Sequence, residues 1–387
     1  MSKITSRRLG DLITLKRGYD LPEKDRIAGP YPVISSAGIS GYHNEYKIDG
    51  QGVVTGRYGT LGEMYFIEGK YWPHNTALYV QNFKGNDPKY IYYLLRCLGR
   101  IRTSDKSAVP GVNRNELHEM AIPAIEDTGV QVAVRKVLEA IDKKIELNNR
   151  INTELEAMAK TLYDYWFVQF DFPDVNGKPY KTSGGKMLYN PVLKREIPEG
   201  WGDASLVDIA TFTNGIACQK YYSSDGEEAY RVIKIREFSS GFDDNSELVR
   251  QSVPEKVVIH DGDILFSWSA TLEVKLWTGG TGALNQHIFK VTSKKYPKTF
   301  YYFEVLKYLE HFKMIAQLRK TTMGHITKDH LTGSRISLPP KRLIEEIDNK
   351  ISPILEMIVT NNQQSSEFAK LRDWLLPMLM NGQVTAR

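Results

Sequence analysis

The chain has almost none of the features that mark secreted, zinc-binding or membrane proteins. Its 387 residues include only two cysteines, Cys97 and Cys218, and neither belongs to a CxxC pair, so we expect neither disulfides nor a structural zinc. No stretch resembles a signal peptide, and no apolar run reaches the length of about 18 residues that spans a bilayer. We therefore expect a cytoplasmic protein.

Sequence motifs of catalysis are also missing. There is no GxxxxGK[ST] loop, no GxGxxG opening a helix, no Asn-Pro-Pro-aromatic methylation loop and no convincing nuclease carboxylate cluster, and the eight histidines form no HExxH. Pro173-Asp174 followed by Lys178 lacks a second acid beside the lysine, which favours a turn over a nuclease site. We expect a chain with no catalysis, metal or cofactor of its own.

Composition and length allow a wide range of functions. The net charge of +5 is compatible with nucleic-acid binding without being diagnostic, and 41% hydrophobic with 25% charged residues is typical of a soluble protein. The chain is too long for one ordinary domain and long enough for two cores.

A narrow apolar stripe from Gln131 to Trp166 predicts one long helix, because its apolar residues recur every three or four positions without Pro or Gly. Such a stripe is typical of a coiled-coil seam, and the helix would be roughly 54 Å long. Its opposite face is nearly balanced in charge, which suits protein partners and water more than phosphates. The stripe consists of Val134, Val137, Leu138, Ile141, Ile145, Ile151, Leu155, Met158 and Leu162.

A second stripe, from Ile344 to Leu379, repeats this pattern near the other end of the chain. Asn361-Asn362 interrupts it as Asn148-Asn149 interrupts the first, and asparagines in a seam fix the register of two paired helices. Ser352-Pro353 has no counterpart in the first helix, so the second helix is expected to start late or to kink there. Two unrelated solvent-facing helices remain the alternative.

The segments before the helices also repeat. Leu9, Asp11, Leu15 and Gly18 recur at a constant offset as Leu206, Asp208, Phe212 and Gly215. Short β-like runs between Gly-rich turns predict mostly β domains, with strands at 31–34, 52–55, 64–67 and 77–80 and a helix at 89–101 in the first. We therefore expect an α+β chain with a tandem repeat of a mostly β domain and a long helix. The predicted segments are domain 1–126, helix 127–168, linker 169–200, domain 201–340 and helix with C-terminal segment 341–387.

Polar, Gly-rich or aromatic loops at matching places in the two domains are candidate binding sites. The turn 55–62 can bring backbone N–H groups and the Arg57 guanidinium against phosphate or guanine, and its counterpart 266–271 offers hydroxyls and Trp268. The triplets 74–76 and 285–287 follow in each domain with amides able to read adenine. A plain hairpin, turn or cap is the alternative for each.

Two basic stretches, 89–114 and 298–328, occupy the same place in the two repeats and each runs into a polar loop. A cationic helix ending in such a loop suits a phosphate clamp with base-reading tips. A solvated charged face is the alternative. Between these anchors the two domains differ freely, as expected for readers of different targets.

Several strings closely resemble the specificity (S) subunits of type I restriction-modification enzymes, over essentially the whole chain. They are Asp142-Lys143-Lys144-Ile145-Glu146-Leu147-Asn148, Leu162-Tyr163-Asp164-Tyr165-Trp166-Phe167, Gly177-Lys178-Pro179-Tyr180 and 371–382. The resemblance implies two target-recognition domains, each reading half of a bipartite double-stranded DNA site, and two helices packed antiparallel as a coiled-coil spacer. It also implies two docked modification subunits that bind S-adenosylmethionine and methylate adenine, and a recruited restriction subunit that uses ATP and Mg.

Half-sites one DNA turn apart are separated by about 34 to 36 Å, which either predicted helix could span. Within the resemblance, we predict DNA contacts from both domains. The DNA is gripped by Arg57, Lys106, Arg114, Lys320 and Lys328, and bases are read by Ser36, Tyr42, Tyr58, His74, Asn75, Trp268, Gln286, His287, Thr322 and His325. In the first domain the predicted contacts are Ser36, Tyr42, Gly56, Arg57, Tyr58, Gly59, Thr60, His74, Asn75, Lys106, Ser107 and Arg114. In the second they are Ser267, Trp268, Ser269, Gln286, His287, Arg319, Lys320, Thr321, Thr322, His325 and Lys328.

Two other functions compete with this one. A coiled-coil adaptor whose domains bind proteins would leave DNA unprotected at every salt concentration. A self-sufficient nuclease or methyltransferase would act as the purified chain alone, and the missing motifs argue against it.

Overall fold

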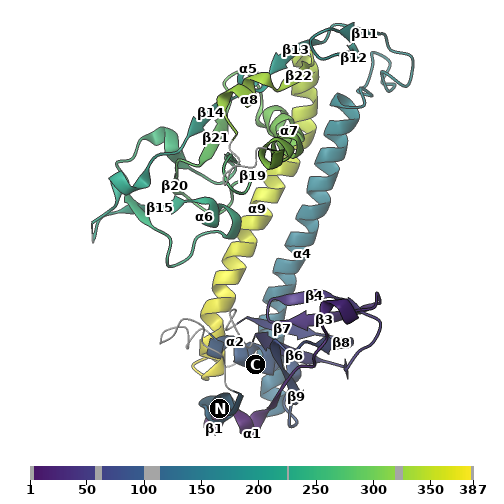
Figure 1. Cartoon of the computed structure of the whole chain (residues 1–387). Helices are drawn as coiled ribbons and strands as arrows, with labels where there is room; N and C mark the ends of the chain where they lie inside the picture. The colour runs from purple at the N-terminus through teal and green to yellow at the C-terminus, as the bar shows by residue number, and fades with distance from the viewer. Residues whose placement is uncertain (1–3, 57–62, 100–113, 225, 319–325, 385–387) are drawn as a thin grey trace. The chain divides into compact units, whose positions relative to one another are not determined.

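The computed structural model describes residues 4–56, 63–99, 114–224, 226–318 and 326–384. The chain divides into two compact units, one formed by Met1–Ile145 with Glu367–Arg387 and the other by Glu146–Ser366. Each unit contains one β-rich domain and a part of both long helices, α4 (Thr128–Phe167) and α9 (Lys341–Met380) (Figure 1).

The β-rich domain of the first unit is built around two four-stranded sheets. Its elements are β1 (Ile4–Arg8), α1 (Leu9–Leu12), β2 (Thr14–Arg17), η1 (Glu23–Asp25), β3 (Tyr31–Ser35), β4 (Gly38–His43), β5 (Ile48–Asp49), β6 (Gly52–Gly56), β7 (Met64–Ile67), β8 (Lys70–Pro73), β9 (Ala77–Asn82), α2 (Pro88–Gly99), α3 (Arg114–Glu119) and β10 (Ala121–Ile125). The sheets have the orders β2-β9-β6-β7 and β4-β3-β8-β5, and β1 pairs with β10. The four predicted strands are confirmed.

The main core of this unit joins the sheet β2-β9-β6-β7 to the helices packed on it. Val53 and Val80 of the first sheet are buried together with Leu94 of α2. Leu138 of α4 and Leu376 of α9 belong to the same cluster, so both long helices cover the first domain. Helix α2 begins within one residue of the predicted helix, and its last predicted positions lie outside the described residues.

The β-rich domain of the second unit has the same topology. Its elements are β13 (Gly202–Ser205), α5 (Leu206–Ile209), β14 (Thr211–Asn214), η2 (Cys218–Tyr221), β15 (Ala229–Ile233), α6 (Ile235–Ser240), β16 (Leu248–Arg250), η3 (Glu255–Val257), β17 (Val258–Ile259), β18 (Ile264–Ser267), β19 (Glu273–Leu276), β20 (Gly282–Leu284), β21 (Ile288–Thr292), α7 (Lys298–Leu318), α8 (Lys328–Gly333) and β22 (Arg335–Leu338). The sheet orders β14-β21-β18-β19 and β16-β15-β20-β17 match those of the first domain strand for strand.

Even the exceptional strand pairings repeat between the domains. β3 pairs in parallel with β8, and β15 pairs in parallel with β20, whereas the other strand neighbours within these sheets are antiparallel. The terminal pair β1–β10 recurs as β13–β22. The predicted α+β tandem repeat is therefore confirmed at the level of topology.

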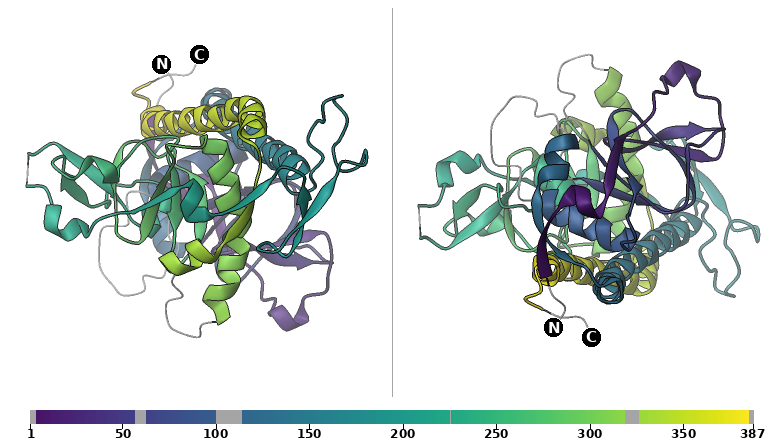
Figure 2. Two further views of the ribbon diagram at one scale, coloured as in Figure 1. Left: turned by 90° about the horizontal axis from the view of Figure 1, so that it is seen from above. Right: turned by 90° about the horizontal axis from the view of Figure 1, so that it is seen from below.

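The two long helices lie side by side and run in opposite directions, as predicted for an antiparallel coiled coil (Figures 1 and 2). In the second unit, Asn148 Nδ2 donates to Asn361 O at 3.3 Å, and Asn152 exchanges side-chain hydrogen bonds with Asn361 and Asn362 at 2.8 Å. In the first unit, Asp142 accepts a 2.8 Å bond from Arg372. Partner numbers fall along α9 as they rise along α4, so the register is antiparallel. None of the helices in the described part of the chain could cross a membrane.

The seam of α4 differs from the predicted stripe. Val137, Ile151 and Met158 are exposed, whereas Asn148, Asn152, Ala159 and Tyr163 are buried against neighbouring elements. The sequence pattern is ambiguous here because a second apolar stripe follows the seam about a third of a turn away. Part of the contact between α4 and α9 is therefore made by the polar residues Asn148 and Asn152, while apolar residues of α4 remain exposed.

Helix α9 corrects the expectation of a late start. It begins at Lys341 and continues through Pro353 to Met380. Pro353 is exposed while Ile351 and Leu355 beside it are buried, so the backbone carbonyl freed by the proline faces the solvent side of the helix. Packing of the neighbouring side chains offsets the missing hydrogen bond.

The segment between α4 and the second domain contains structure that we did not predict. A hairpin of β11 (Met187–Asn190) and β12 (Arg195–Pro198) follows a turn in which Asp174 Oδ1 accepts the backbone N–H groups of Asn176 and Lys178, each at 2.8 Å. The interpretation of this segment as a turn is confirmed. The strands are short and carry exposed apolar residues such as Leu188, which hid them from pattern analysis.

Candidate nucleic-acid interface

In the first domain, the turn after β8 meets the end of β2. His74 forms a parallel bridge with Tyr19, and the backbone N–H of Gly18 donates to Ala77 O at 3.1 Å. A Cβ on Gly18 would lie 2.1 Å from His74 O, so only glycine permits this approach. The predicted base-reading residues His74 and Asn75 are thereby fixed beside the last residue of β2.

That last residue, Arg17, belongs to a small polar cluster with Asp20 and Asn75. Its Nε donates to Asn75 O at 3.3 Å, and its Nη2 lies 3.9 Å from Asp20 Oδ1. Asn75 Nδ2 donates to the same Asp20 carboxylate. The cluster offers a guanidinium, an amide and a carboxylate at one strand end.

The surroundings of His74 favour the neutral form of its imidazole. Burial lowers the pKa of its imidazole, and the positive charge of Arg26 adds to the effect. Its Nδ1 lies 3.0 Å from Thr76 Oγ1, which also accepts the backbone N–H of Ser36 at 3.4 Å. A neutral ring can accept or donate one hydrogen bond according to its tautomer.

The second domain repeats this meeting of turn and strand. Asn285 bridges in parallel with Ile216, and the N–H of Gly215 donates to Ile288 O at 3.1 Å. A Cβ on Gly215 would lie 2.2 Å from Asn285 O. The predicted triplets 74–76 and 285–287 therefore occupy equivalent places in the two domains.

Different chemistry fills that place in the second domain. Trp268 Nε1 donates to Asn214 Oδ1 at 3.0 Å, and its ring centroid lies 5.7 Å from that of His287. Gln286 Nε2 lies 3.4 Å from His287 Nε2, and Gln286 is exposed. The structure thus brings together three of the predicted residues, Trp268, Gln286 and His287.

Two predicted contact residues of this domain point away from its surface. Ser267 and Ser269 are buried, and the hydroxyl of Ser267 donates to Ser269 O at 3.3 Å. They are turned inward because Ser267 ends β18, a strand buried at every position. Gly56, which ends the equivalent strand β6, is buried as well and could contribute no surface of its own.

Tyr42 lies apart from this cluster. It is exposed on β4, where it pairs with Pro32, and β3 separates it from β8. It belongs to the same domain as His74 but to a different part of its surface, so the structure does not unite the two.

The predicted phosphate-gripping cations Arg114 and Lys328 occupy matching positions. Each is exposed and opens the short helix before the last domain strand, α3 in the first domain and α8 in the second. In the second domain this helix adjoins the polar cluster, because Ile326 N donates to Trp268 O at 3.1 Å.

The remaining predicted residues lie outside the described part of the chain. They fall between β6 and β7, between α2 and α3, and between α7 and α8. They are Arg57, Tyr58, Gly59, Thr60, Lys106, Ser107, Arg319, Lys320, Thr321, Thr322 and His325.

Sequence reasoning missed Arg17, Asp20 and Asn214. The available signal was the repeated glycine, since Arg17 and Asn214 each precede it at the same offset. The glycine lets two backbone segments come into contact, and that contact fixes the direction of the side chain just before it. The repeated glycine could therefore have marked both positions.

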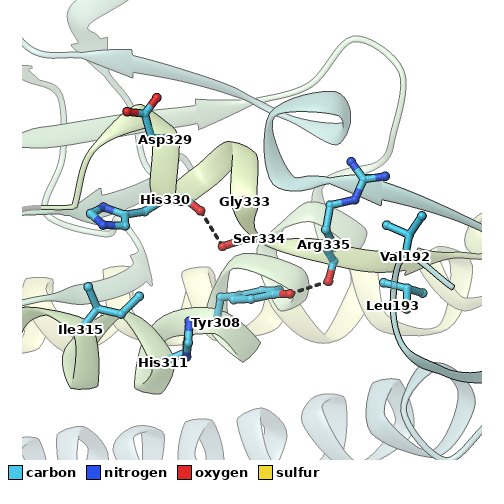
Figure 3. Close-up of a pocket in the computed structure, with 10 residues that line it drawn as sticks. All are labelled: Val192, Leu193, Tyr308, His311, Ile315, Asp329, His330, Gly333, Ser334 and Arg335. Atoms are coloured by element: carbon cyan, nitrogen blue, oxygen red, sulfur yellow. Dashed lines mark hydrogen bonds between the residues drawn. The ribbon is translucent and has the colours of Figure 1, made fainter.

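An open groove of about 510 Å³ lies on the second domain between α7, α8 and the β11–β12 turn (Figure 3). Tyr308 OH of α7 donates to Arg335 O of β22 and so ties two walls of the groove, while Ser334 Oγ donates to His330 O at 2.8 Å at the end of α8. Val192 and Leu193 form an apolar end. Among the described residues no group of His, Cys, Asp or Glu could hold a metal ion, in this groove or elsewhere.

A known protein family matches most of the chain. The family described as type I restriction modification DNA specificity domain matches residues 1–157 and 198–367. The chain is 24% identical over 323 residues to the type I restriction enzyme MjaIX specificity subunit of Methanocaldococcus jannaschii, covering 79% of this chain and 72% of that protein. It is 23% identical over 362 residues to the HindI specificity subunit of Haemophilus influenzae, covering 77% of each.

A solved structure shares the fold. The S subunit of a type I restriction-modification system from M. genitalium superposes with a TM-score of 0.60, covering 98% of this chain and 96% of that one at 14% identity.

Proposed function

Because the chain belongs to the type I restriction-modification DNA specificity family, we propose that it selects a bipartite DNA target through its two β-rich domains. The observation that carries this proposal is a common scaffold with different chemistry at one place. In both domains a glycine lets a turn pack against the end of a strand. The polar cluster at this place consists of Arg17, Asp20 and Asn75 in the first domain. In the second domain it consists of Asn214, Trp268 and Gln286.

A shared scaffold with unlike reading groups suits an asymmetric target. Guanidinium and amide groups distinguish guanine and adenine through their major-groove edges, and an indole supplies an apolar face. Cations at the starts of α3 and α8, Arg114 and Lys328, would hold phosphates in the two half-sites without reading sequence.

The paired helices would serve as the spacer between the two half-sites. Hydrogen bonds of Asn152 to Asn361 and Asn362 fix one register, because a shifted pairing would leave these buried or half-buried amides unsatisfied. A fixed register gives a fixed spacing, which a bipartite reader needs.

Partner subunits would dock on the exposed face of α4. Leu147, Ile151, Met158 and Tyr165 are all exposed and, at about 100° per residue, lie within a narrow strip of the helix in the second unit. Such a stripe favours protein partners. We propose that methyltransferase subunits bind there and carry S-adenosylmethionine, that restriction subunits using ATP and Mg join through that complex, and that this chain itself catalyses nothing.

Footprinting of the purified chain on genomic fragments, over a range of salt concentrations, tests the proposal. A specific reader protects two short blocks, and Lys328→Ala weakens protection of all sequences alike while lowering the salt slope by about one. Lys341→Ala is the matched control, since Lys341 is exposed on α9 and, among the residues that the structure describes, pairs with Glu345 of its own helix at 3.3 Å. A protein-binding scaffold would protect no DNA at any salt concentration.

A further inference from the structure

We infer that the residue preceding the close-approach glycine decides specificity in each domain, and that Arg17 reads guanine in the half-site of the first. The inference rests on the proposed function, because it specifies which side chain of a DNA-reading surface distinguishes one base.

The backbone fixes where this side chain emerges. Gly18 and Tyr19 are hydrogen-bonded to Ala77 O at 3.1 Å and Pro73 O at 2.8 Å, so the end of β2 is clamped on both sides of the turn that contains Asn75. Arg17, the last residue of β2, extends beside that turn, since its Nε donates to Asn75 O.

The neighbours of Arg17 orient its guanidinium but do not use all of its hydrogen-bond donors. Its Nε edge is bound to Asn75 O at 3.3 Å, while the side chain remains 54% exposed. Within the described residues, Nη1 donates no hydrogen bond, and Nη2 has only the distant Asp20 carboxylate at 3.9 Å. Two outward amino groups on one planar fork match the O6 and N7 acceptors of guanine.

A purely structural role for Arg17 is poorly supported by these contacts. An ion pair at 3.9 Å between side chains that are 54% and 74% exposed contributes little to folding. Asn75 does not need the arginine either, because its own amide is held by Asp20. The contacts restrict the motion of the guanidinium, which reduces the entropy lost when it binds a base.

The second domain supports the importance of the position. Asn214 precedes Gly215 as Arg17 precedes Gly18, and its Oδ1 accepts the Trp268 indole N–H at 3.0 Å. Asn214 is therefore a positioning residue that fixes the orientation of the half-buried Trp268 ring, which also lies 5.7 Å from the Phe289 ring between centroids. One place in the scaffold thus carries a direct reader in one domain and the support of a reader in the other.

Selection of binding sites from a randomised duplex library by the full chain tests the inference. Arg17→Ala should lose the preference for guanine at one position of one block, by roughly 5- to 150-fold, and Arg17→Lys should not restore it because lysine lacks the planar fork. The second block is an internal control for folding. Arg7→Ala, which removes an exposed arginine paired with Glu126, should leave the whole motif unchanged.

The other results contradict the inference in distinguishable ways. An unchanged motif from Arg17→Ala overturns it while the proposed function stands. If Arg17→Ala weakens binding to all sequences equally and Arg17→Lys restores it, Arg17 contacts phosphate, and the inference is also overturned. Failure of the unaltered chain to select any sequence refutes the proposed function together with the inference.

The second domain provides a parallel arm of the same experiment. Asn214→Ala should broaden only the other block, and Asn214→Asp should largely restore it, because a carboxylate oxygen can still accept the Trp268 N–H. Asn245→Ala, at an exposed turn of the same domain, is the control and should change nothing. An unaltered block from Asn214→Ala would show that the two positions are not functionally equivalent.

Discussion

Replacing Asp142 of α4 by alanine is expected to destabilise the first unit by about 3 kcal/mol. This carboxylate joins three helices, since it accepts the Tyr93 hydroxyl of α2 at 2.6 Å and Arg372 Nη1 of α9 at 2.8 Å. The side chain of Arg372 is 15% exposed and that of Asp142 is 28% exposed. If one of the two is removed, water therefore cannot fully replace the hydrogen bond that the other has lost.

The magnitude follows from the two bonds. A hydrogen bond to a charged group contributes about 1.5 to 3 kcal/mol, and the lower end is taken because the effects of groups that share one partner do not add fully. Loss of a partner from a buried ion pair costs about 3 to 5 kcal/mol, which is reduced here because Arg372 keeps Asp373 at 3.0 Å and some access to water. Together these give the value above.

Hydrogen exchange by mass spectrometry provides the assay, because it reports on residues 128–145 and 367–380 separately from the rest of the chain. Asp164→Ala is the matched control on the same helix, where Asp164 pairs with an exposed Lys160 one turn away and its loss should cost under about 1 kcal/mol. Equal protection in both variants would refute the reasoning that Asp142 fastens α2 and α9 to α4.

Three further changes have defined outcomes. Gly18→Ala should unfold the end of β2 and abolish binding to one half-site only, because its Cβ would meet His74 O at 2.1 Å; affinity measured on split half-sites checks this, and retained binding to both would contradict it. Leu155→Pro should break α4 at a cost of about 3 kcal/mol or more and prevent assembly with the proposed modification subunits in gel filtration, whereas intact assembly would show that docking does not need the helix. The pKa of Asp171 lies below its ordinary value of 3.8 because the Thr182 N–H and hydroxyl donate to it, so its contribution to stability is full above that value and is lost as the pH falls through the lowered pKa. Thermal melts between pH 5 and about pH 2 should therefore be less acid-sensitive in Asp171→Asn, and identical slopes would count against this contact.

The repeated architecture could be predicted because it depends on periodicity. Apolar spacing of three and four gave both long helices, and the echo of Gly18 in Gly215 located equivalent strand ends. Asparagines in the seam were also predictable as a type, although Asn152 rather than Asn149 makes the bonds, since one residue along a helix turns a side chain by about 100°.

What escaped prediction depends on tertiary packing. Ile151 and Met158 have the composition of core residues but remain exposed, and the sequence alone cannot say which of two adjacent apolar stripes meets a neighbour. Ser267 looks like a loop residue yet lies inside a buried strand end. Nothing in the local sequence marks Arg17 or Asn214 as a site residue. Their role becomes visible only when the turns 74–76 and 285–287 pack against them in the folded domains.

Mapping methylated adenines in the DNA of cells that carry this chain with the proposed modification subunits decides whether the two domains read a bipartite target. We expect one asymmetric motif of two short specified blocks separated by an unspecified gap of constant length. A single continuous motif, a variable gap or methylation without sequence preference would contradict this expectation.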